Sequence, residues 1–231
     1  MKVRKPSIPV LFLLLAAPCF AQTDYASGLA SAKATDARRE PLQRASEILS
    51  SLDLKSGDSA ADVGAGAGYY TERLSSIVGP KGRIFAVEIR EVSLGELRER
   101  VRADHLDNVT VIRGEPENPH LETGTLDGVL IVDAYHEMKE YQSMLGQVRN
   151  ALKPGGRLAI ADYCNRPDRS EPREILVRKH FLPPQMVSEE LTRAGFEMVR
   201  VEDPLAERKP ENKEDRIAQG DLWLLVARRP R

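Results

Sequence analysis

The chain has 231 residues, of which 41% are hydrophobic and 30% are charged, and its formal net charge is −1 at pH 7. This composition is typical of one soluble α/β domain that is large enough to bury a core. It argues against a nucleic-acid-binding surface, because lysine and arginine are spread along the chain and aromatic residues make up only 5%.

The first 21 residues have the pattern of a secretory signal peptide. Three basic residues stand among the first five, an apolar run follows over Val10–Ala17, and small residues precede a predicted cleavage after Ala21. The run is too short to span a bilayer. We therefore expect a secreted or periplasmic protein with no stable membrane insertion after cleavage. Residues 22–35 are predicted to be a flexible tether, followed by a single domain over 36–231.

Short apolar runs alternate with helical patterns along that domain. The runs predict buried strands over 59–63, 83–88, 108–113, 126–133 and 157–161. The helical patterns predict helices over 36–52, 69–78, 91–102, 139–152 and 184–194, with Pro41 kinking or restarting the first. This alternation indicates a parallel sheet with helices on both faces.

The pattern changes towards the C-terminus. Residues 163–182 are polar and predict an exposed segment across the top of the sheet. Two further strands are expected over 196–201 and 221–227, and 203–218 is predicted to be a charged loop. Because no helix separates these two strands, they should pair as an antiparallel hairpin.

A glycine-rich loop follows the first strand, with the sequence Asp62-Val63-Gly64-Ala65-Gly66-Ala67-Gly68. Gly64 and Gly66 can adopt backbone angles closed to other residues and leave room where a Cβ would lie. Gly68 allows the next helix to begin close to the strand. Backbone N–H groups at such a helix start suit the anionic end of a ligand. The alternative is a tight turn with no ligand.

The order of signals after this loop resembles the class I S-adenosylmethionine-dependent methyltransferases. The loop Asp62–Gly68 looks like their acid-x-Gly-x-Gly-x-Gly motif, Glu88 ends the second strand where that family has an acid, and Glu115 follows the third strand. Leu126–Val129 and Leu152–Gly156 look like their fourth-strand entry and their turn before strand five. The resemblance covers residues 36–231. It implies a Rossmann-like doubly wound α/β fold with seven strands, mostly parallel, a C-terminal antiparallel hairpin and helices on both faces.

The resemblance also implies S-adenosylmethionine as the cofactor and assigns residues to it. Glu88 offers two acceptor oxygens for the two ribose hydroxyls; the alternative is a solvated strand end. Glu115 is expected near the adenine amino group, although the family more often has Asp there. The cofactor-binding residues expected are Asp62, Gly64, Ala65, Gly66, Gly68, Glu88, Glu115 and Asp133. Asp62 is expected to accept backbone N–H groups of the glycine loop and to face the methionine amino group.

Methyl transfer can rely mostly on holding donor and nucleophile in line. A hydroxyl acceptor also needs a base, and His136, just past the fourth strand, is the candidate catalytic residue; the alternative is a histidine bonded to backbone. Tyr135 is expected to form a wall of the methyl pocket or to pack in the core. Tyr163 and His180 are expected on the acceptor side.

The predicted function is methyl transfer to a small-molecule acceptor, with no nucleic-acid partner. The alternative is an exported, non-catalytic nucleoside- or ligand-binding protein, because the cofactor is made and kept in the cytoplasm. A nicotinamide-dependent oxidoreductase is less favoured, because its G-x-G-x-x-G pattern would need glycine at Tyr69. Cys164 is the one cysteine beyond the signal peptide, and the chain has no CxxC or HExxH pattern. We therefore expect no internal disulfide and no metal site.

Overall fold

A computed structural model describes residues 24–165, 169–207 and 220–231. The predicted signal peptide, residues 1–21, lies outside this range and stays a prediction. The strands are β1 (Ser59–Val63), β2 (Arg83–Glu88), β3 (Val109–Arg113), β4 (Leu126–Val132), β5 (Leu152–Cys164), β6 (Glu197–Ala206) and β7 (Asp221–Arg228). The helices are α1 (Tyr25–Gln43), α2 (Ala45–Ser51), α3 (Tyr69–Val78), α4 (Glu91–Ala103), the 3₁₀ helix η1 (Tyr135–Glu137), α5 (Tyr141–Ala151), α6 (Arg173–Arg178) and α7 (Pro184–Arg193).

The seven strands form one sheet in the order β3-β2-β1-β4-β5-β7-β6. Strands β1 to β5 pair in parallel, and β7 runs antiparallel to both β5 and β6. The predicted doubly wound sheet with its antiparallel hairpin is confirmed. The strand order reverses between β1 and β4, and ligands of such sheets bind outside the carboxyl ends of the strands at that point.

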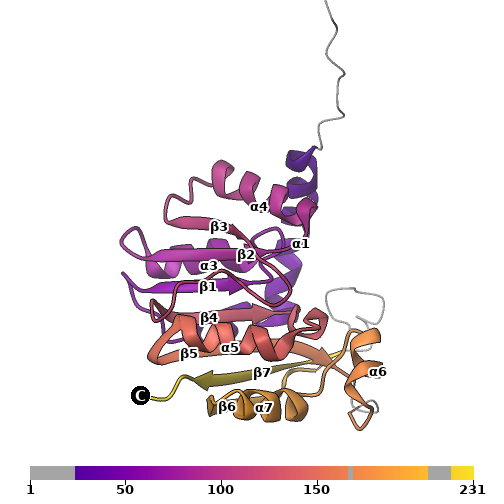
Figure 1. Cartoon of the computed structure of the whole chain (residues 1–231). Helices are drawn as coiled ribbons and strands as arrows, with labels where there is room; N and C mark the ends of the chain where they lie inside the picture. The colour runs from indigo at the N-terminus through magenta and orange to yellow at the C-terminus, as the bar shows by residue number, and fades with distance from the viewer. Residues whose placement is uncertain (1–23, 166–168, 208–219) are drawn as a thin grey trace, which may run out of the picture.

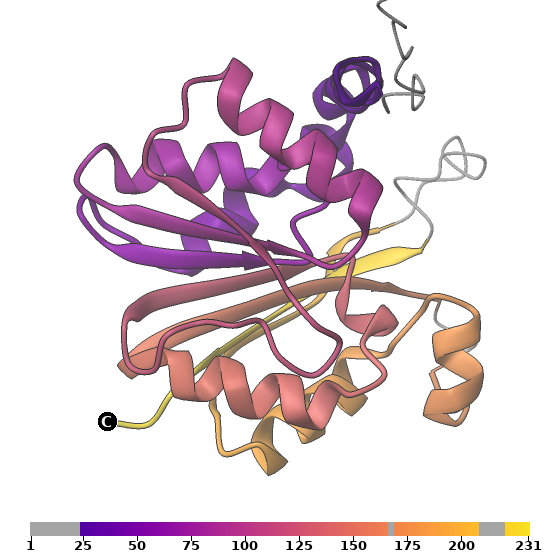
Figure 2. The same cartoon turned by 45° about the horizontal axis from the view of Figure 1, so that its top comes forward.

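Helices cover both faces of the sheet (Figures 1 and 2). Leu130 of β4 packs with Leu74 of α3 on one face, and its neighbour Ile131 packs with Leu145 of α5 on the other. All four side chains are at most 1% exposed. Burial of a side chain of this size contributes about 2 kcal/mol to stability. The continuous apolar runs in the sequence follow from this burial on both faces.

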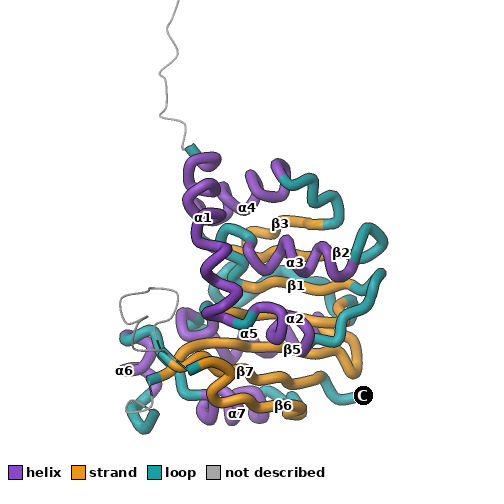
Figure 3. The backbone as a smooth tube through the Cα atoms, turned by 180° about the vertical axis from the view of Figure 1, so that it is seen from behind, coloured by secondary structure: helices purple, strands orange, loops and turns teal. Residues whose placement is uncertain are grey.

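The predicted N-terminal tether was wrong for the residues that the structure describes. Most of that segment belongs to α1, which begins at Tyr25 and runs from α4 to the start of α2 (Figure 3). The ring of Tyr25 lies against Gly95 of α4, where an added Cβ would come within about 2.0 Å of it. Lys33 forms an ion pair of 2.5 Å with Asp104 at the end of α4. The sequence pattern missed this helix because Leu29 and Gln43 are its only buried residues, so it has no apolar stripe.

Three other boundaries differ from the prediction. The helix predicted over 36–52 is divided at Arg44, which has a φ of 50°, and α1 continues past Pro41. Strand β5 begins at Leu152 rather than 157, and β6 continues to Ala206. The predicted exposed segment over 163–182 contains α6.

The chain after α6 is fixed to the sheet. The N–H of Leu182 donates to the carbonyl oxygen of Tyr163 at 3.1 Å, and the indole N–H of Trp223 donates to the carbonyl oxygen of Leu182 at 2.7 Å. Leu182 and Leu176 are fully buried. This segment is therefore part of the packed domain at the carboxyl end of β5. Among the described helices, none combines the length and the apolar character needed to cross a membrane.

Candidate cofactor and acceptor site

A cleft of about 290 Å³ lies at the carboxyl ends of β1, β2 and β4. It occupies the point where the strand order reverses, which is the expected ligand position in a doubly wound sheet. The residues that line it are Val63, Gly64, Val87, Glu88, Ile89, Arg90, Glu115, Pro116, Asp133, Ala134, Glu137, Met138, Lys139 and Met144. Four of the predicted site residues, Gly64, Glu88, Glu115 and Asp133, are thus brought together.

The glycine loop forms one wall of the site and requires its glycines. Gly64 has a φ of 81°, and a Cβ on it would lie 2.6 Å from the Cβ of Ala134. Gly66 has a φ of 55°, and no atom lies within 4 Å of where its Cβ would be. The N–H groups of Gly64 and Ala65 both donate to the carbonyl oxygen of Val87, at 2.9 and 3.0 Å. The loop is therefore bound to β2, and Gly66 borders open space that a ligand can approach.

Glu88 holds the other side of the glycine loop. Its side chain is 3% exposed. Its Oε2 accepts the N–H of Gly66 at 2.9 Å, and its Oε1 accepts those of Ile89 and Arg90 at 2.8 and 2.9 Å. A carboxylate has about four acceptor positions, so Oε2 is the oxygen with a position left for a hydroxyl. The two-oxygen contact with a ribose stays a prediction.

Asp62 is buried at the end of β1 and accepts the hydroxyl of Thr71 on α3 at 2.6 Å. Burial raises the pKa of Asp62 to about 6, although the hydrogen bond from Thr71 opposes this rise, and the nearby charge of Glu88 adds to it. The carboxylate that accepts an N–H of the glycine loop is thus Glu88, whereas Asp62 joins β1 to α3. The sequence analysis assigned the hydrogen bond with the glycine loop to Asp62 and not to Glu88, because both acids lie at the ends of strands at the same edge of the sheet.

Asp133 follows β4 in a left-handed conformation with a φ of 53°, and its N–H donates to the carbonyl oxygen of Ala161 at 2.9 Å. Burial raises the pKa of Asp133 to about 7, and the negative charge of Asp162 adds to this rise. A φ in this range is uncommon for residues other than glycine, although Asp is among the types that adopt it most often. Asp133 therefore offers a carboxyl group with a raised pKa beside the cleft.

His136 and Asp162 form a buried pair next to Asp133. The Nδ1 of His136 lies 2.9 Å from Asp162 Oδ1, and the side chains are 5% and 0% exposed. Burial alone would lower the pKa of His136, but the hydrogen bond and the charge of Asp162 outweigh it and raise that pKa. The backbone N–H of His136 also donates to Asp162, at 3.1 Å. The ring is thus held with Nε2 directed away from Asp162.

Tyr135 does not line the cleft. Its side chain is fully buried, and its hydroxyl donates to Glu190 on α7 at 2.8 Å. The ring of Tyr141 packs edge to face against that of Tyr135, with the ring centres 6.4 Å apart. The prediction that Tyr135 forms a wall of the methyl pocket is corrected by this placement, because η1 turns its side chain into the core beneath α7. Packing is the role that the structure favours.

Glu115 is the most exposed of the predicted cofactor residues, with a side chain 59% accessible. Its backbone pairs with Asn118 across a short turn, and the Nε2 of His120 lies 3.6 Å from its Oε1. The side chain thus lies at the outer rim of the cleft, where a ligand could still bring it into contact.

Two groups that sequence reasoning missed support the site. Arg100 of α4 is 1% exposed; its Nε donates to the carbonyl oxygen of Ala67 at 2.6 Å, and its guanidinium pairs with Glu72 at 2.6 Å and Asp36 at 2.8 Å. It ties the glycine loop to α1, α3 and α4. The sequence contains a signal for Asp162, because this acid directly follows the apolar core of β5. It contains none for Arg100, which is one of several charged residues of a helix.

The hydroxyl of Tyr163 accepts a hydrogen bond from Gln43 at 3.1 Å, and Tyr70 donates to the amide oxygen of Gln43 at 3.2 Å. This buried network joins the end of α1 to β5 and α3. It fixes the end of α1 at the carboxyl edge of the sheet.

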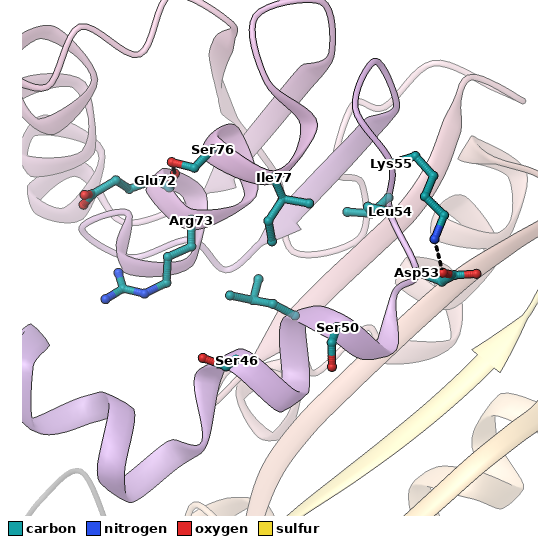
Figure 4. A pocket seen from close by; sticks show the side chains of 10 residues that line it. Ser46, Ser50, Asp53, Leu54, Lys55, Glu72, Arg73, Ser76 and Ile77 are labelled. Atoms are coloured by element: carbon teal, nitrogen blue, oxygen red, sulfur yellow. Dashed lines mark hydrogen bonds and ion pairs between the residues drawn. The ribbon is translucent and has the colours of Figure 1, made fainter.

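A second hollow of about 750 Å³ lies between α2 and α3, on the face of the sheet that α5 does not cover (Figure 4). Its charged residues are paired: Lys55 bonds Asp53, and the guanidinium of Arg73 lies 3.7 Å from the ring centre of Tyr69. It is larger than the cleft, but none of the residues that line it belongs to a strand or to the glycine loop. We therefore assign the chemistry to the cleft.

Comparison with known proteins agrees with this geometry. Residues 54–215 match the model of a family described as a methyltransferase domain. The chain belongs to this methyltransferase family. A crystal structure of a SAM-dependent methyltransferase from Aquifex aeolicus has a TM-score of 0.69 and 27% identity, over 90% of this chain and 100% of that one.

Curated relatives of this methyltransferase differ in the acceptors that their names give. A demethylmenaquinone methyltransferase of Shouchella clausii is 29% identical over 116 residues, which are 50% of this chain and 49% of the relative. A protein-L-isoaspartate O-methyltransferase of Ignicoccus hospitalis is 28% identical over 113 residues, 49% and 51% of the two chains. The chain thus spans about half the length of these relatives. The family match also argues against the nicotinamide oxidoreductase alternative.

The residues of the methyltransferase fit S-adenosylmethionine, the cofactor of its family. The space over Gly66 leaves room for a ligand to approach the backbone, and the remaining acceptor position on Glu88 suits a ribose hydroxyl. Asp133 adds a carboxyl group to the lining of the cleft, and the contacts of Asp62 and Asp133 with the cofactor stay predictions. When bound, this cofactor supplies an electrophilic methyl group on a sulfonium sulfur.

Proposed function

We propose that the protein transfers a methyl group from S-adenosylmethionine to a small-molecule acceptor. The observation that carries this proposal is the junction of Glu88 and Gly66, joined by a hydrogen bond of 2.9 Å at the point where the strand order reverses. This junction places an anchored carboxylate and an open glycine backbone side by side, and together they suit the ribose and methionine parts of the cofactor.

In the proposed reaction the acceptor's nucleophilic atom attacks the methyl carbon in line with the sulfur. The new bond to carbon forms as the carbon–sulfur bond breaks, and its electron pair stays on sulfur. The protein's main contribution is to hold the two reactants in line. Asp62 would face the methionine amino group, and Asp133, after β4, would lie beside the methyl donor.

A hydroxyl acceptor must also lose its proton. His136 is the group available for this, because Asp162 fixes its ring and Nε2 faces the side of the cleft that Glu137 lines. It could do so by accepting the proton at Nε2 or by holding a cation there that lowers the pKa of the hydroxyl. Tyr163 and His180, from β5 and the segment after α6, would complete the acceptor side.

The acceptor is proposed to be a small molecule. The relatives named above act on different kinds of acceptor by their names, and their matched halves do not identify one for this chain. The net charge of −1 gives no support to a nucleic-acid acceptor. From the pattern of the first 21 residues, we also propose that the chain is exported; N-terminal sequencing of the protein purified from its natural host would test the cleavage after Ala21.

Calorimetric titration of the full chain with S-adenosylmethionine and with its demethylated product tests the cofactor site. We expect micromolar binding by the wild type. Glu88→Ala should bind at least tenfold more weakly, because a hydrogen bond to a charged group is worth about 1.5–3 kcal/mol. Glu88→Gln keeps the side-chain shape and one acceptor oxygen, so it separates loss of charge from loss of structure. Glu91→Ala is the matched control, since that exposed acid three residues away pairs only with Arg113 in the described structure.

Far-UV circular dichroism establishes that each variant is folded. A folded wild type that binds neither compound would refute the proposed function and favour the non-catalytic binder. Equal affinity of Glu88→Ala and Glu91→Ala would show that Glu88 does not hold the cofactor.

A further inference from the structure

Three side chains of the types that bind metal ions lie together beyond the carboxyl end of β4. They are His136, Glu137 and His180, and one ligand atom from each lies within 4.8 Å of the others. The Nε2 of His136 is 3.9 Å from Glu137 Oε1, and the rings of His136 and His180 meet edge to face with centres 5.4 Å apart. Around a tetrahedral zinc ion with bonds of about 2.1 Å, ligand atoms are about 3.4 Å apart. The separations between the three ligand atoms would have to shorten by about an ångström to complete such a site, and the exposed side chains of Glu137 and His180 can move by this amount.

Asp162 prepares His136 for this role. It is fully buried and accepts from the Nδ1 of His136 at 2.9 Å, so the proton of the neutral ring is on Nδ1 and the lone pair is on Nε2. A carboxylate that orients a histidine in this way is the usual outer partner of a metal-binding histidine. Asp162 also accepts the backbone N–H groups of His136 and Tyr163, at 3.1 and 2.8 Å. Its oxygens are therefore occupied, and Asp162 acts as the orienting partner and not as a ligand.

His180 is held near His136 by the packing of its segment. Its N–H donates to the carbonyl oxygen of Val177 at 3.1 Å, and two residues later Leu182 is bonded to both β5 and Trp223 of β7. The backbone of His180 is left-handed, with a φ of 59°, which is uncommon for a residue with a side chain. The anchored segment thus presents the imidazole towards His136.

The geometry points to a site for a divalent transition-metal ion, bound by His136 Nε2, the carboxylate of Glu137 and the imidazole of His180. Two imidazoles and one carboxylate suit Zn²⁺, Mn²⁺ or Fe²⁺, whereas Mg²⁺ and Ca²⁺ prefer oxygen ligands. Three protein ligands leave at least one coordination position open. Because Glu137 also lines the cofactor cleft, that position faces the acceptor side.

The role of this ion rests on the proposed function. An acceptor hydroxyl that enters the open position would have its pKa lowered by the cation, as happens to metal-bound water. Its proton would pass to water, and the oxygen would then attack the methyl carbon. The site therefore favours acceptors whose nucleophilic atom can bind the cation and lose a proton there, a hydroxyl or enol oxygen or a thiol, over carbon nucleophiles.

Zinc titration of the full chain tests the site. The protein is stripped with a chelator and titrated calorimetrically with ZnCl₂, with MgCl₂ as the comparison ion, and Co²⁺ is added to follow its visible absorption, which reports histidine ligation. We expect one Zn²⁺ per chain, at least tenfold weaker binding in His180→Ala and in Glu137→Gln, and loss of the cobalt absorption in His180→Ala. His105→Ala is the matched control, since His105 is also an exposed, left-handed histidine but lies at the far end of α4.

Equal zinc affinity in the wild type, His180→Ala and Glu137→Gln would overturn the site and leave adventitious surface binding. Absence of zinc binding by the folded wild type would overturn it as well. S-adenosylmethionine binding is measured for the wild type and for His180→Ala and is expected to change less than threefold, because His180 does not line the cofactor cleft. Zinc binding without cofactor binding would refute the proposed function alone, and cofactor binding without zinc binding would refute the metal site alone.

Discussion

Replacement of Asp62 by asparagine should change how the stability of the fold depends on pH. Asp62 is fully buried at the end of β1, and its pKa is raised from 3.8 to about 6, mainly by burial. The folded protein therefore holds this proton at pH values where the unfolded chain has already lost it. Because the folded state binds more protons in this range, the free energy of unfolding contributed by Asp62 falls as pH rises from about 4 to about 6.

The size of the effect follows from the shift. A difference of about 2 pKa units corresponds to about 3 kcal/mol at 1.36 kcal/mol per unit. Part of this is already lost at pH 4, near the pKa of the unfolded chain, so about 2–3 kcal/mol remains between pH 4 and pH 8. Asparagine keeps an oxygen that can accept the hydroxyl of Thr71 but has no proton to lose. The free energy of unfolding of Asp62→Asn, relative to that of the wild type, should therefore rise by about 2–3 kcal/mol as the pH is raised from 4 to 8.

Urea unfolding at several pH values between 4 and 8, followed by far-UV circular dichroism, measures this difference. All other titrating groups are shared by the two proteins, so their contributions cancel in the comparison. Curves of stability against pH that run parallel for the wild type and Asp62→Asn would refute the reasoning. The role proposed for Asp62 also predicts weaker binding of S-adenosylmethionine by the same variant, because the carboxylate proposed to face the methionine amino group is lost.

Two other substitutions test the geometry of the site and its support. Gly64→Ala should lose about 3 kcal/mol of stability, because the backbone is left-handed and the new Cβ would contact Ala134. It should also lose cofactor binding. The control is Gly57→Ala, at a residue with a φ of 94° and no atom within 4 Å of the added Cβ, which should show only the backbone cost of about 1–2 kcal/mol. Equal losses in urea unfolding of the two variants would contradict the contact. Trp223→Phe removes the donor to the carbonyl oxygen of Leu182 and should lower the free energy of unfolding by about 1–3 kcal/mol. Urea unfolding is followed by circular dichroism, because Trp223 is the one tryptophan of the chain and the variant has no tryptophan fluorescence. An unchanged urea midpoint would show that this bond does not stabilise the segment after α6.

The parts of the fold that local pattern determines were predicted from the sequence. The strands around Val63, Glu88 and Val132 are buried on both faces, so they appear as apolar runs, and the glycines after β1 mark a turn that other residues cannot form. The position of Glu88 at a strand end was enough to place it at the cofactor site, because parallel strands end at one edge of the sheet, but its bond to the N–H of Gly66 was not predicted. The glycine loop and Glu88 can therefore be recognised from the order of the residues alone.

Contacts between distant segments were decided only by the tertiary structure. Helix α1 has no apolar stripe, so its packing through Tyr25 on Gly95 left no periodic signal. The pair of His136 and Asp162 joins residues 26 positions apart, and His180 reaches it only because Leu182 is fixed to β5 and β7. Hydrophobic periodicity records which face of an element is buried, whereas the meeting of polar side chains depends on where the sheet places the ends of its strands. That placement is why a chain with no recognisable metal motif brings two histidines and a glutamate together.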